Sequence, residues 1–223
     1  MALTIRQTSH RSGLLAPRGD RPRVLNVGCG DFAPNKLHGV FDRGAWDEIR
    51  LDIDPKVKPD LIGTVTDMRD MVPDGAFDGI YSSHNIEHLH SFEVGPTLRE
   101  FHRVLRADGF ALITCPDLSA VAQMIVDGKL MEVIYDAPAG PIRAVDMLYG
   151  HQRSVERGNH YMMHNTGFTQ QHLGEMLATC GFNEVLVCRG SMHDLWALAL
   201  RERAQKQRVI ARLKQFRLDF TAR

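Results

Sequence analysis

The hydrophobic and polar positions of the chain predict strands and helices in alternation. Five runs in the first half have the length and composition of strands: residues 24–27, 49–54, 60–65, 77–83 and 110–115. Residues 84–101 instead repeat apolar side chains at steps of three and four, which is typical of an amphipathic helix, and Pro96 predicts a break into two helices. Strands that alternate with helices indicate an α/β fold with a mainly parallel sheet.

The second half shows a long interruption before this alternation resumes. Residues 168–180 have the spacing of an amphipathic helix, and residues 185–188 and 195–200 are predicted strands. In the interruption, residues 121–134 predict one or two short helices. Residues 147–165 are polar, aromatic and rich in histidine without periodicity, which is typical of a loop over an active site, with an ordinary solvated loop as the alternative.

The two ends of the chain differ from the part between them. Residues 1–20 are polar and predict a loose arm, and residues 21–200 form the predicted domain, with an insertion at residues 118–166. Residues 201–223 carry eight Lys or Arg and a narrow apolar stripe on one predicted helix, which consists of Val209, Leu213, Phe216 and Phe220. Because burial of such a face stabilises a helix, we expect this stripe to pack against protein, with a homodimer favoured over the same chain. An anionic membrane surface and nucleic acid are the alternatives.

Composition excludes some classes of partner. The formal net charge is zero, so the composition points neither to nucleic acid nor to an acidic substrate. The four cysteines are far apart and form no Cys-x-x-Cys pair, which fits reduced thiols and a cytoplasmic location. No apolar run approaches the ~20 residues of a membrane-spanning helix, and the N-terminus lacks the apolar core of a signal peptide, so no membrane insertion is expected.

Residues 24–31 (V-L-N-V-G-C-G-D) combine a buried strand with a glycine turn. Glycine accepts positive φ and brings no Cβ between the backbone and a ligand, so Gly28 and Gly30 predict a nucleotide-like ligand at the carboxyl end of this strand. An ordinary glycine turn is the alternative. Residues 28–33 also fit the G-x-G-x-x-[GA] pattern of nicotinamide-dependent dehydrogenases. Pro34, Gly39 and Gly44 disfavour the long helix that this pattern needs, so a short or irregular first helix is expected.

An acidic residue follows at the spacing that a ribose contact requires. Asp52 lies 24 residues beyond Gly28, at the end of the second predicted strand, where a carboxylate can accept hydrogen bonds from both ribose hydroxyls. Asp54 faces the same side of the strand and is the competing candidate. Two solvated surface acids are the alternative to both.

Four segments together resemble the class I S-adenosylmethionine-dependent methyltransferases, in particular the small bacterial methyltransferase-11-like proteins. They read V-L-N-V-G-C-G, L-D-I-D-P, F-D-G-I-Y-S-S-H-N-I-E-H-L and L-R-E-F-H-R-V-L-R-A-D-G-F-A-L-I-T-C-P, within residues 22–118, and the resemblance resumes at residues 167–182. It implies a doubly wound seven-stranded sheet of the Rossmann-like methyltransferase fold, mainly parallel with an antiparallel last strand and helices on both faces. It also implies S-adenosylmethionine as the cofactor.

The resemblance implies a role for each part of the cofactor site. Gly28 and Gly30 would lie against the methionine part, Asp52 would hold the ribose, and Asp67 and Met68 would meet the adenine through a carboxylate and a backbone amide. Ser83 and His84 would line the methyl-donor end. The complete predicted cofactor set is Asn26, Gly28, Cys29, Gly30, Asp52, Ile53, Asp67, Met68, Ser83 and His84.

Methyl transfer to a hydroxyl or amine needs a proton acceptor, and histidine suits this role because its ordinary pKa is near neutral. His84 directly follows the fourth predicted strand and is the first candidate for the base; His88, one turn later, is the second. The predicted acceptor contacts are Tyr149, His151, His160, Tyr161 and His164. By analogy with the family, we expect a small-molecule or sugar acceptor. A cofactor-binding protein without catalysis, and a modifier of nucleic acid or protein, stay open as alternatives.

Residues 84–88 (H-N-I-E-H) also fit an inverted zinc-protease signature. On a helix, the imidazoles of His84 and His88 would share one face, as a metal site requires. No acidic third ligand follows at a recognisable spacing, and the methyltransferase resemblance already accounts for Glu87 and His88. The sequence therefore predicts no metal.

Overall fold

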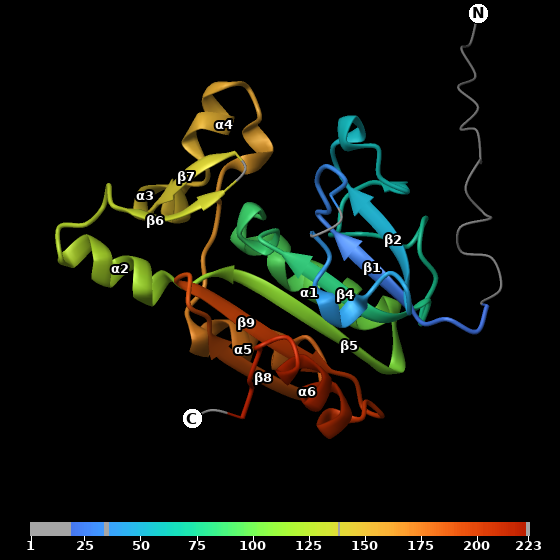
Figure 1. Ribbon diagram of the computed structural model, residues 1–223. Coiled ribbons are helices and arrows are strands. Elements are labelled where there is room, and N and C mark those ends of the chain that lie inside the picture. Colours follow the sequence, from blue (N-terminus) through green and yellow to red (C-terminus); the bar gives the residue numbers. More distant parts are fainter. Residues whose placement is uncertain (1–18, 34–35, 138, 222–223) are drawn as a thin grey trace, which may run out of the picture.

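A computed structural model describes residues 19–33, 36–137 and 139–221, so the predicted arm lies outside the described residues except for Gly19 and Asp20. Its centre is a seven-stranded sheet in the order β3-β2-β1-β4-β5-β9-β8 (Figure 1). The strands are β1 (Arg23–Val27), β2 (Asp47–Asp52), β3 (Leu61–Ile62), β4 (Phe77–Ser83), β5 (Leu105–Pro116), β8 (Glu184–Arg189) and β9 (Asp194–Leu200). Strands β1 to β5 pair in parallel, and β9 runs antiparallel to both β5 and β8. The predicted fold class is confirmed.

The helix after β4 differs from its prediction. Helix α1 (Ser91–Val104) runs through Pro96 without a break, and the interruption falls earlier, between a short 3₁₀ helix, η3 (Ile86–His88), and α1. Proline inside a helix removes a backbone hydrogen bond at a cost of about 3 kcal/mol. Burial of Leu98 and Phe101 on the sheet offsets this cost. The predicted break at Pro96 is therefore wrong.

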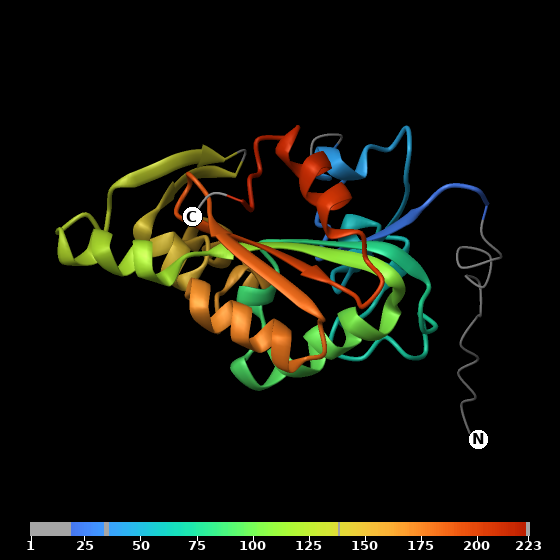
Figure 2. The ribbon, with the colours of Figure 1, turned by 90° about the horizontal axis from the view of Figure 1, so that it is seen from below.

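Helices cover both faces of the sheet. On one face, α1 and α5 (Gln170–Thr179) pack on residues such as Leu25, Ile80 and Ala111. On the other face, Val24, Tyr81 and Leu112, which alternate with these along the strands, pack against Phe41, Trp46 and helix α6 (Lys206–Lys214). Figure 2 shows α6, in red, on the side of the sheet opposite to α1 and α5.

The first crossover is irregular, as predicted. Between β1 and β2, the described residues contain a single 3₁₀ helix, η1 (Gly39–Phe41), and no α-helix. Helix α6 covers the sheet beside this segment, so the C-terminal helix occupies a face that a full first crossover helix would otherwise cover.

The C-terminal helix is shorter than predicted and packs on its own chain. Of the predicted stripe, Leu213 and Phe220 are buried, Val209 is half-buried, and Phe216 is 42% exposed beside the ring of His38. Ile210 and Leu218, which the predicted stripe omitted, are buried instead. The surface that suggested a homodimer is thus largely covered by the same chain, and the homodimer stays a prediction.

The insertion leaves and rejoins the sheet at one place. Asp117 pairs with Phe168, and Leu118 N–H donates to the Phe168 carbonyl at 2.9 Å. Between them lie α2 (Leu118–Val126), a hairpin of β6 (Val133–Ala137) and β7 (Gly140–Arg143), α3 (Ala144–Tyr149), α4 (Gln152–Glu156) and a 3₁₀ helix, η4 (His160–Met162). Val133 and Ile134 lie in a strand, so the helix predicted to include them is wrong. Residues 147–165 contain short helical turns instead of one irregular loop. Figure 1 shows the insertion beside the carboxyl ends of β1 and β4.

Among the described residues, the structure contains no helix with the length and apolar character needed to cross a bilayer.

Candidate active site

A cleft of about 580 Å³ lies at the carboxyl ends of β1, β2 and β4, and the insertion contributes one wall. Parallel strands bring their carboxyl ends to one edge of a sheet, which is where α/β proteins bind ligands. Most of the predicted cofactor set lines this cleft. These residues are Asn26, Gly28, Cys29, Gly30, Asp52, Ile53, Ser83 and His84.

The glycine turn after β1 has the backbone conformation that the sequence predicts. Gly28 and Gly30 have φ of +60° and +57°, in the region that side chains disfavour. A Cβ on Gly28 would lie 2.2 Å from Asn85 Nδ2, so the absence of a side chain lets Asn85 approach the turn. Asn85 also lines the cleft, and its Oδ1 is buried without a hydrogen-bond partner among the described residues.

Asp52 joins the first two strands at the cleft. Its Oδ2 accepts a hydrogen bond from Gly30 N–H at 2.8 Å, and its Oδ1 accepts one from Asp54 N–H at 2.9 Å. Each carboxylate oxygen can accept a further bond from a ligand. Asp54 also lines the cleft, but its Oδ1 caps a 3₁₀ helix, η2 (Pro55–Val57), by accepting from Lys56 N–H at 2.9 Å.

Asp67 and Met68 are not among the residues that line the cleft, and their predicted contacts with the adenine stay a prediction. Met68 is fully buried, and its N–H donates to Glu100 Oε2 at 2.7 Å, so this amide is already used. The Asp67 side chain is 59% exposed and pairs with Arg69 at 3.5 Å. Strand β3 has only two residues, so the chain reaches the cleft earlier, at residues 63–65.

His84 lines the cleft and has an unusual backbone conformation. Its φ of +47° is rare for a residue with a side chain, and its N–H donates to the Thr114 carbonyl at 2.9 Å. The His84 side chain is 41% exposed, and its Nδ1 lies 3.1 Å from Oε1 of Glu87, which is 1% exposed. Burial lowers the pKa of His84, but the hydrogen bond and charge of Glu87 outweigh this, so the pKa is raised above its ordinary value.

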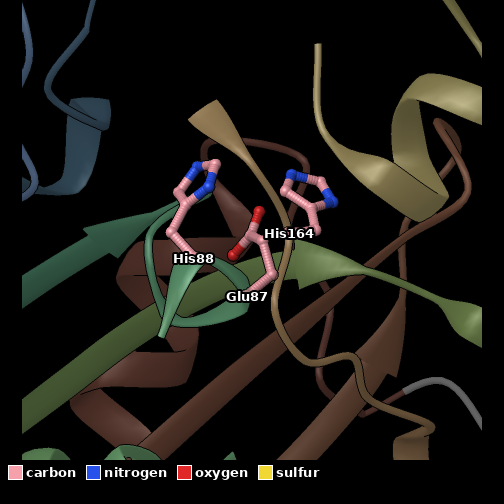
Figure 3. Close-up of side chains that lie close together, drawn as sticks. All are labelled: Glu87, His88 and His164. Atoms are coloured by element: carbon pink, nitrogen blue, oxygen red, sulfur yellow. The ribbon is translucent and has the colours of Figure 1, made fainter. Parts of the chain in front are cut away.

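Glu87 also lies between His88 and His164 (Figure 3). One ligand-type atom from each of these three side chains lies within 4.8 Å of the others. Burial raises the pKa of Glu87. The hydrogen bond with His84 and the charges of the three neighbouring histidines lower it by more than burial raises it, so the pKa lies below its ordinary value. The pKa of His164 is lowered, mainly by burial.

The paired imidazoles that the zinc-protease signature would require are not formed. Residues 84–88 are not an α-helix, because His84 has positive φ and only residues 86–88 form a 3₁₀ turn. The histidine that joins His88 comes from the insertion, far along the chain, and no local sequence spacing could have identified it.

The predicted acceptor residues divide into two groups. His160 and Tyr161 line the cleft, together with Asn159, Met162 and Asn165, which the sequence did not single out. Tyr149 lies largely exposed outside the lining, and His151 is buried with its Nδ1 2.8 Å from Ser154 Oγ. His164 is held beside Glu87 instead of in the cleft wall.

The likeness of the chain to known proteins agrees with this geometry. Residues 25–113, which contain the glycine turn, Asp52 and His84, match the family model Methyltransf_11, described as "Methyltransferase domain". This part of the chain is therefore a methyltransferase domain. Its cofactor is therefore S-adenosylmethionine, and the methyltransferase is an enzyme.

Solved structures share the fold of this methyltransferase at low sequence identity. A SAM-dependent methyltransferase from Archaeoglobus fulgidus is 14% identical with a TM-score of 0.53, over 82% of this chain and 87% of that one. The PH0226 protein from Pyrococcus horikoshii is 15% identical with a TM-score of 0.54, over 81% and 82%. The 1,6-didemethyltoxoflavin-N1-methyltransferase of Burkholderia thailandensis, which has bound 1,6-didemethyltoxoflavin and S-adenosylhomocysteine, is 17% identical with a TM-score of 0.50, over 81% and 71%. No curated protein matches the chain.

The cleft of this methyltransferase fits its cofactor. The turn at Gly28 and Gly30 brings backbone to the cleft without side chains, and Asp52 retains acceptor capacity for ribose hydroxyls. The buried Oδ1 of Asn85 is an acceptor for a ligand amine. A dinucleotide site needs a long helix directly after the turn, which the described residues of this segment lack.

Proposed function

We propose that this methyltransferase methylates a hydroxyl or an amine of a small-molecule or sugar acceptor. The observation that carries the proposal is the composition of the cleft. The glycine turn and Asp52 line it at the ends of β1 and β2, His84 lines it directly after β4, and His160 and Tyr161 line it from the insertion.

The part of the cleft that is lined by the glycine turn and Asp52 holds the cofactor. Asp52 accepts hydrogen bonds from the ribose, and the turn at Gly28 and Gly30 lies against the methionine part. Asn26, Cys29, Ile53 and Ser83 complete the cofactor contacts. Because Asp67 and Met68 lie outside the cleft, residues 63–65 are better placed to meet the adenine.

His84 takes the acceptor proton. Its Nδ1 faces the Glu87 carboxylate, which can only accept, so the neutral ring donates from Nδ1 and keeps a lone pair on Nε2. When bound, S-adenosylmethionine supplies a methyl group whose bond to sulfur breaks, with the electron pair retained by sulfur, as the acceptor atom bonds to carbon. His84 then binds the proton that the acceptor loses, and His88 is the second candidate for this role.

Two observations support a small acceptor. The cleft is bounded by the insertion, whose residues Asn159, His160 and Tyr161 offer hydrogen-bonding groups in the same cleft as His84. The enzyme from Burkholderia thailandensis, which has the same fold, contains 1,6-didemethyltoxoflavin together with S-adenosylhomocysteine. The zero net charge of the chain gives no reason to expect nucleic acid.

A cytoplasmic location and a homodimer belong to the same proposal. The four cysteines carry free thiols, which supports a reducing compartment. A homodimer through the C-terminal helix would use the exposed ring of Phe216, because Leu213 and Phe220 are already buried.

The test has two steps. Calorimetric titration is expected to detect binding of S-adenosylmethionine and no binding of NAD. S-adenosylhomocysteine release is then measured with pools of small hydroxyl compounds, amines and sugars, and with protein and nucleic acid as controls. Release with a small-molecule pool supports the proposal. Release only with protein or nucleic acid, or cofactor binding without release in any pool, would overturn it.

A further inference from the structure

Glu87, His88 and His164 form a cluster that the reaction described above does not use in full. Glu87 and His88 come from the short helix after β4, and His164 comes from the end of the insertion. Figure 3 shows the Glu87 carboxylate between the two imidazole rings. The ring centroids of His88 and His164 are 4.8 Å apart.

Backbone carbonyls fix the tautomer of both rings. His88 Nδ1 lies 2.9 Å from the Met163 carbonyl, and His164 Nδ1 lies 2.9 Å from the Met147 carbonyl. A carbonyl can only accept, so Nδ1 carries the proton in each ring, and the neutral ring has its lone pair on Nε2. Histidines that bind metal ions are held in this way, with the other ring nitrogen donating to a carbonyl or carboxylate.

Only one of the two carboxylate oxygens of Glu87 has a hydrogen-bond partner among the described residues. Oε1 faces His84, whereas Oε2 is buried and has no hydrogen-bond partner among the described residues. A buried carboxylate is costly unless cations or donors surround it. The groups that lower the pKa of this carboxyl are the neighbouring side chains of His84, His88 and His164.

We propose that Glu87, His88 and His164 bind a divalent metal ion, with Zn²⁺ as the best match. Two imidazole nitrogens and one carboxylate oxygen form a ligand set of catalytic zinc sites, which keep a further position open. Tetrahedral ligands at about 2.0–2.2 Å from Zn²⁺ lie about 3.3 Å from one another. The ligand atoms, now within 4.8 Å of one another, therefore move closer together on binding.

The site has a function that rests on the proposed methyl transfer. His88 lines the cleft, so the ion lies at its edge, close to His84. Zn²⁺ acts as a Lewis acid and lowers the pKa of a hydroxyl that it binds. The acceptor oxygen then loses its proton to His84 before it bonds to the methyl carbon. The substrate class is accordingly a hydroxyl compound that can reach His88.

Metal binding is tested on the full chain without cofactor or acceptor. Protein freed of metal with a chelator is titrated with Co²⁺, whose visible absorption reports on coordination geometry, and Zn²⁺ is then added as a competitor. One Co²⁺ per chain with a tetrahedral spectrum, displaced by Zn²⁺, is expected. Absence of a stoichiometric site would overturn the proposal.

Two variants and a matched control locate the site. Glu87→Gln and His164→Gln are expected to weaken Zn²⁺ binding by more than the roughly 10- to 100-fold that loss of an outer partner costs. His160→Gln removes a histidine from the same insertion outside the cluster and is expected to leave binding unchanged. Equal loss in all three, or no loss in the first two, would mean that the ion binds elsewhere.

A measurement on the unmodified protein guards against variants that fail to fold. Zn²⁺ is expected to raise the Tm of the wild type, because a ligand that binds only the native state stabilises that state. It is expected to leave the Tm of His164→Gln unchanged. No shift in the wild type would contradict the site. Full methyl transfer in the presence of chelator would refute the role of the ion in the reaction. No methyl transfer by the zinc-loaded enzyme to any small acceptor would instead refute the proposed function.

Discussion

The backbone N–H of Gly30 donates a hydrogen bond to Oδ2 of Asp52, with 2.8 Å between nitrogen and oxygen. This bond joins the turn after β1 to the end of β2. Together with the bond from Asp54 N–H to Oδ1, it holds the Asp52 carboxylate in one orientation before any ligand arrives. The carboxylate that we propose as the ribose contact is therefore already oriented and needs little reordering on binding.

Asp52→Ala is expected to weaken S-adenosylmethionine binding by about 1–3 kcal/mol, because the ribose hydroxyls lose their acceptor. Calorimetric titration measures the change. Asp54→Ala is the matched control, since Asp54 also lines the cleft but its carboxylate caps η2. Wild-type affinity in Asp52→Ala, with reduced affinity in Asp54→Ala, would show that Asp54 is the ribose residue.

Gly28→Ala is expected to lower both stability and cofactor affinity. A φ of +60° costs a residue with a side chain about 1–2 kcal/mol, and the new Cβ would collide with Asn85. In the Gly28→Ala/Asn85→Gly double variant the collision is removed, because the Asn85 Cβ would also lie only 2.9 Å from the new Cβ, so the two effects on the free energy of unfolding should not add. Urea denaturation of all four proteins measures this coupling. Strictly additive values would mean that Asn85 does not limit the space at Gly28.

His84→Asn is expected to lower kcat by roughly 10²–10⁴ while the Kd for S-adenosylmethionine changes little, because the proton acceptor is lost. Asparagine tolerates positive φ, so the backbone at residue 84 is preserved. His193→Asn is a matched control, since His193 has φ of +57° and does not line the cleft. Unchanged turnover in His84→Asn would exclude His84 as the base and direct the search to His88 and His160.

Leu213→Ala is expected to cost about 2–5 kcal/mol of unfolding free energy, because Leu213 is fully buried between α6 and the sheet. Phe216→Ala, at a position that is largely exposed, should cost less. Urea denaturation gives the free energies, and light scattering gives the mass in solution. A change of mass without loss of stability in Leu213→Ala would show that α6 packs on a second copy.

The cysteine thiols are expected to react slowly in the folded protein. Burial raises the pKa of Cys29 and of Cys188 to about 11, and burial also raises the pKa of Cys115 and Cys180. With a pKa of about 11, only about a thousandth of a thiol is ionised at pH 8, and the thiolate is the reactive form. A disulfide reagent should therefore label the native protein far more slowly than the protein in denaturant. Rapid labelling of one native thiol at pH 8 would contradict this.

Local features carried most of the correct sequence predictions. Asp52 ends β2, and the glycine turn and His84 directly follow β1 and β4. Parallel strands bring such positions to one edge, so their meeting needed no long-range information. The structure departs from the sequence expectation where distant contacts decide. Glu100 of α1 takes the amide of Met68, and burial of α1 outweighs the tendency of Pro96 to break a helix.

The insertion shows the same division between local and distant information. Val133 and Ile134 continue a helical spacing from α2, yet they pair with β7 in a hairpin that only the folded insertion defines. The approach of His164 to Glu87 likewise depends on the return of the chain to η3, where Asn165 N–H donates to the Glu87 carbonyl at 2.9 Å. The spacing of residues along the sequence does not predict such a long-range contact.

Helix α6 follows all strands of the sheet in the sequence, and this order has a consequence for biosynthesis. Phe41, Trp46 and Phe110 are synthesised long before Leu213, which covers the same face of the sheet. A nascent or truncated chain that stops short of α6 therefore presents an open aromatic surface, and exposed surface of this kind promotes aggregation and exposes chains to chaperones and proteases. Only a chain that extends through α6 hides this surface, so the burial of this face waits for the synthesis of residues 206–214.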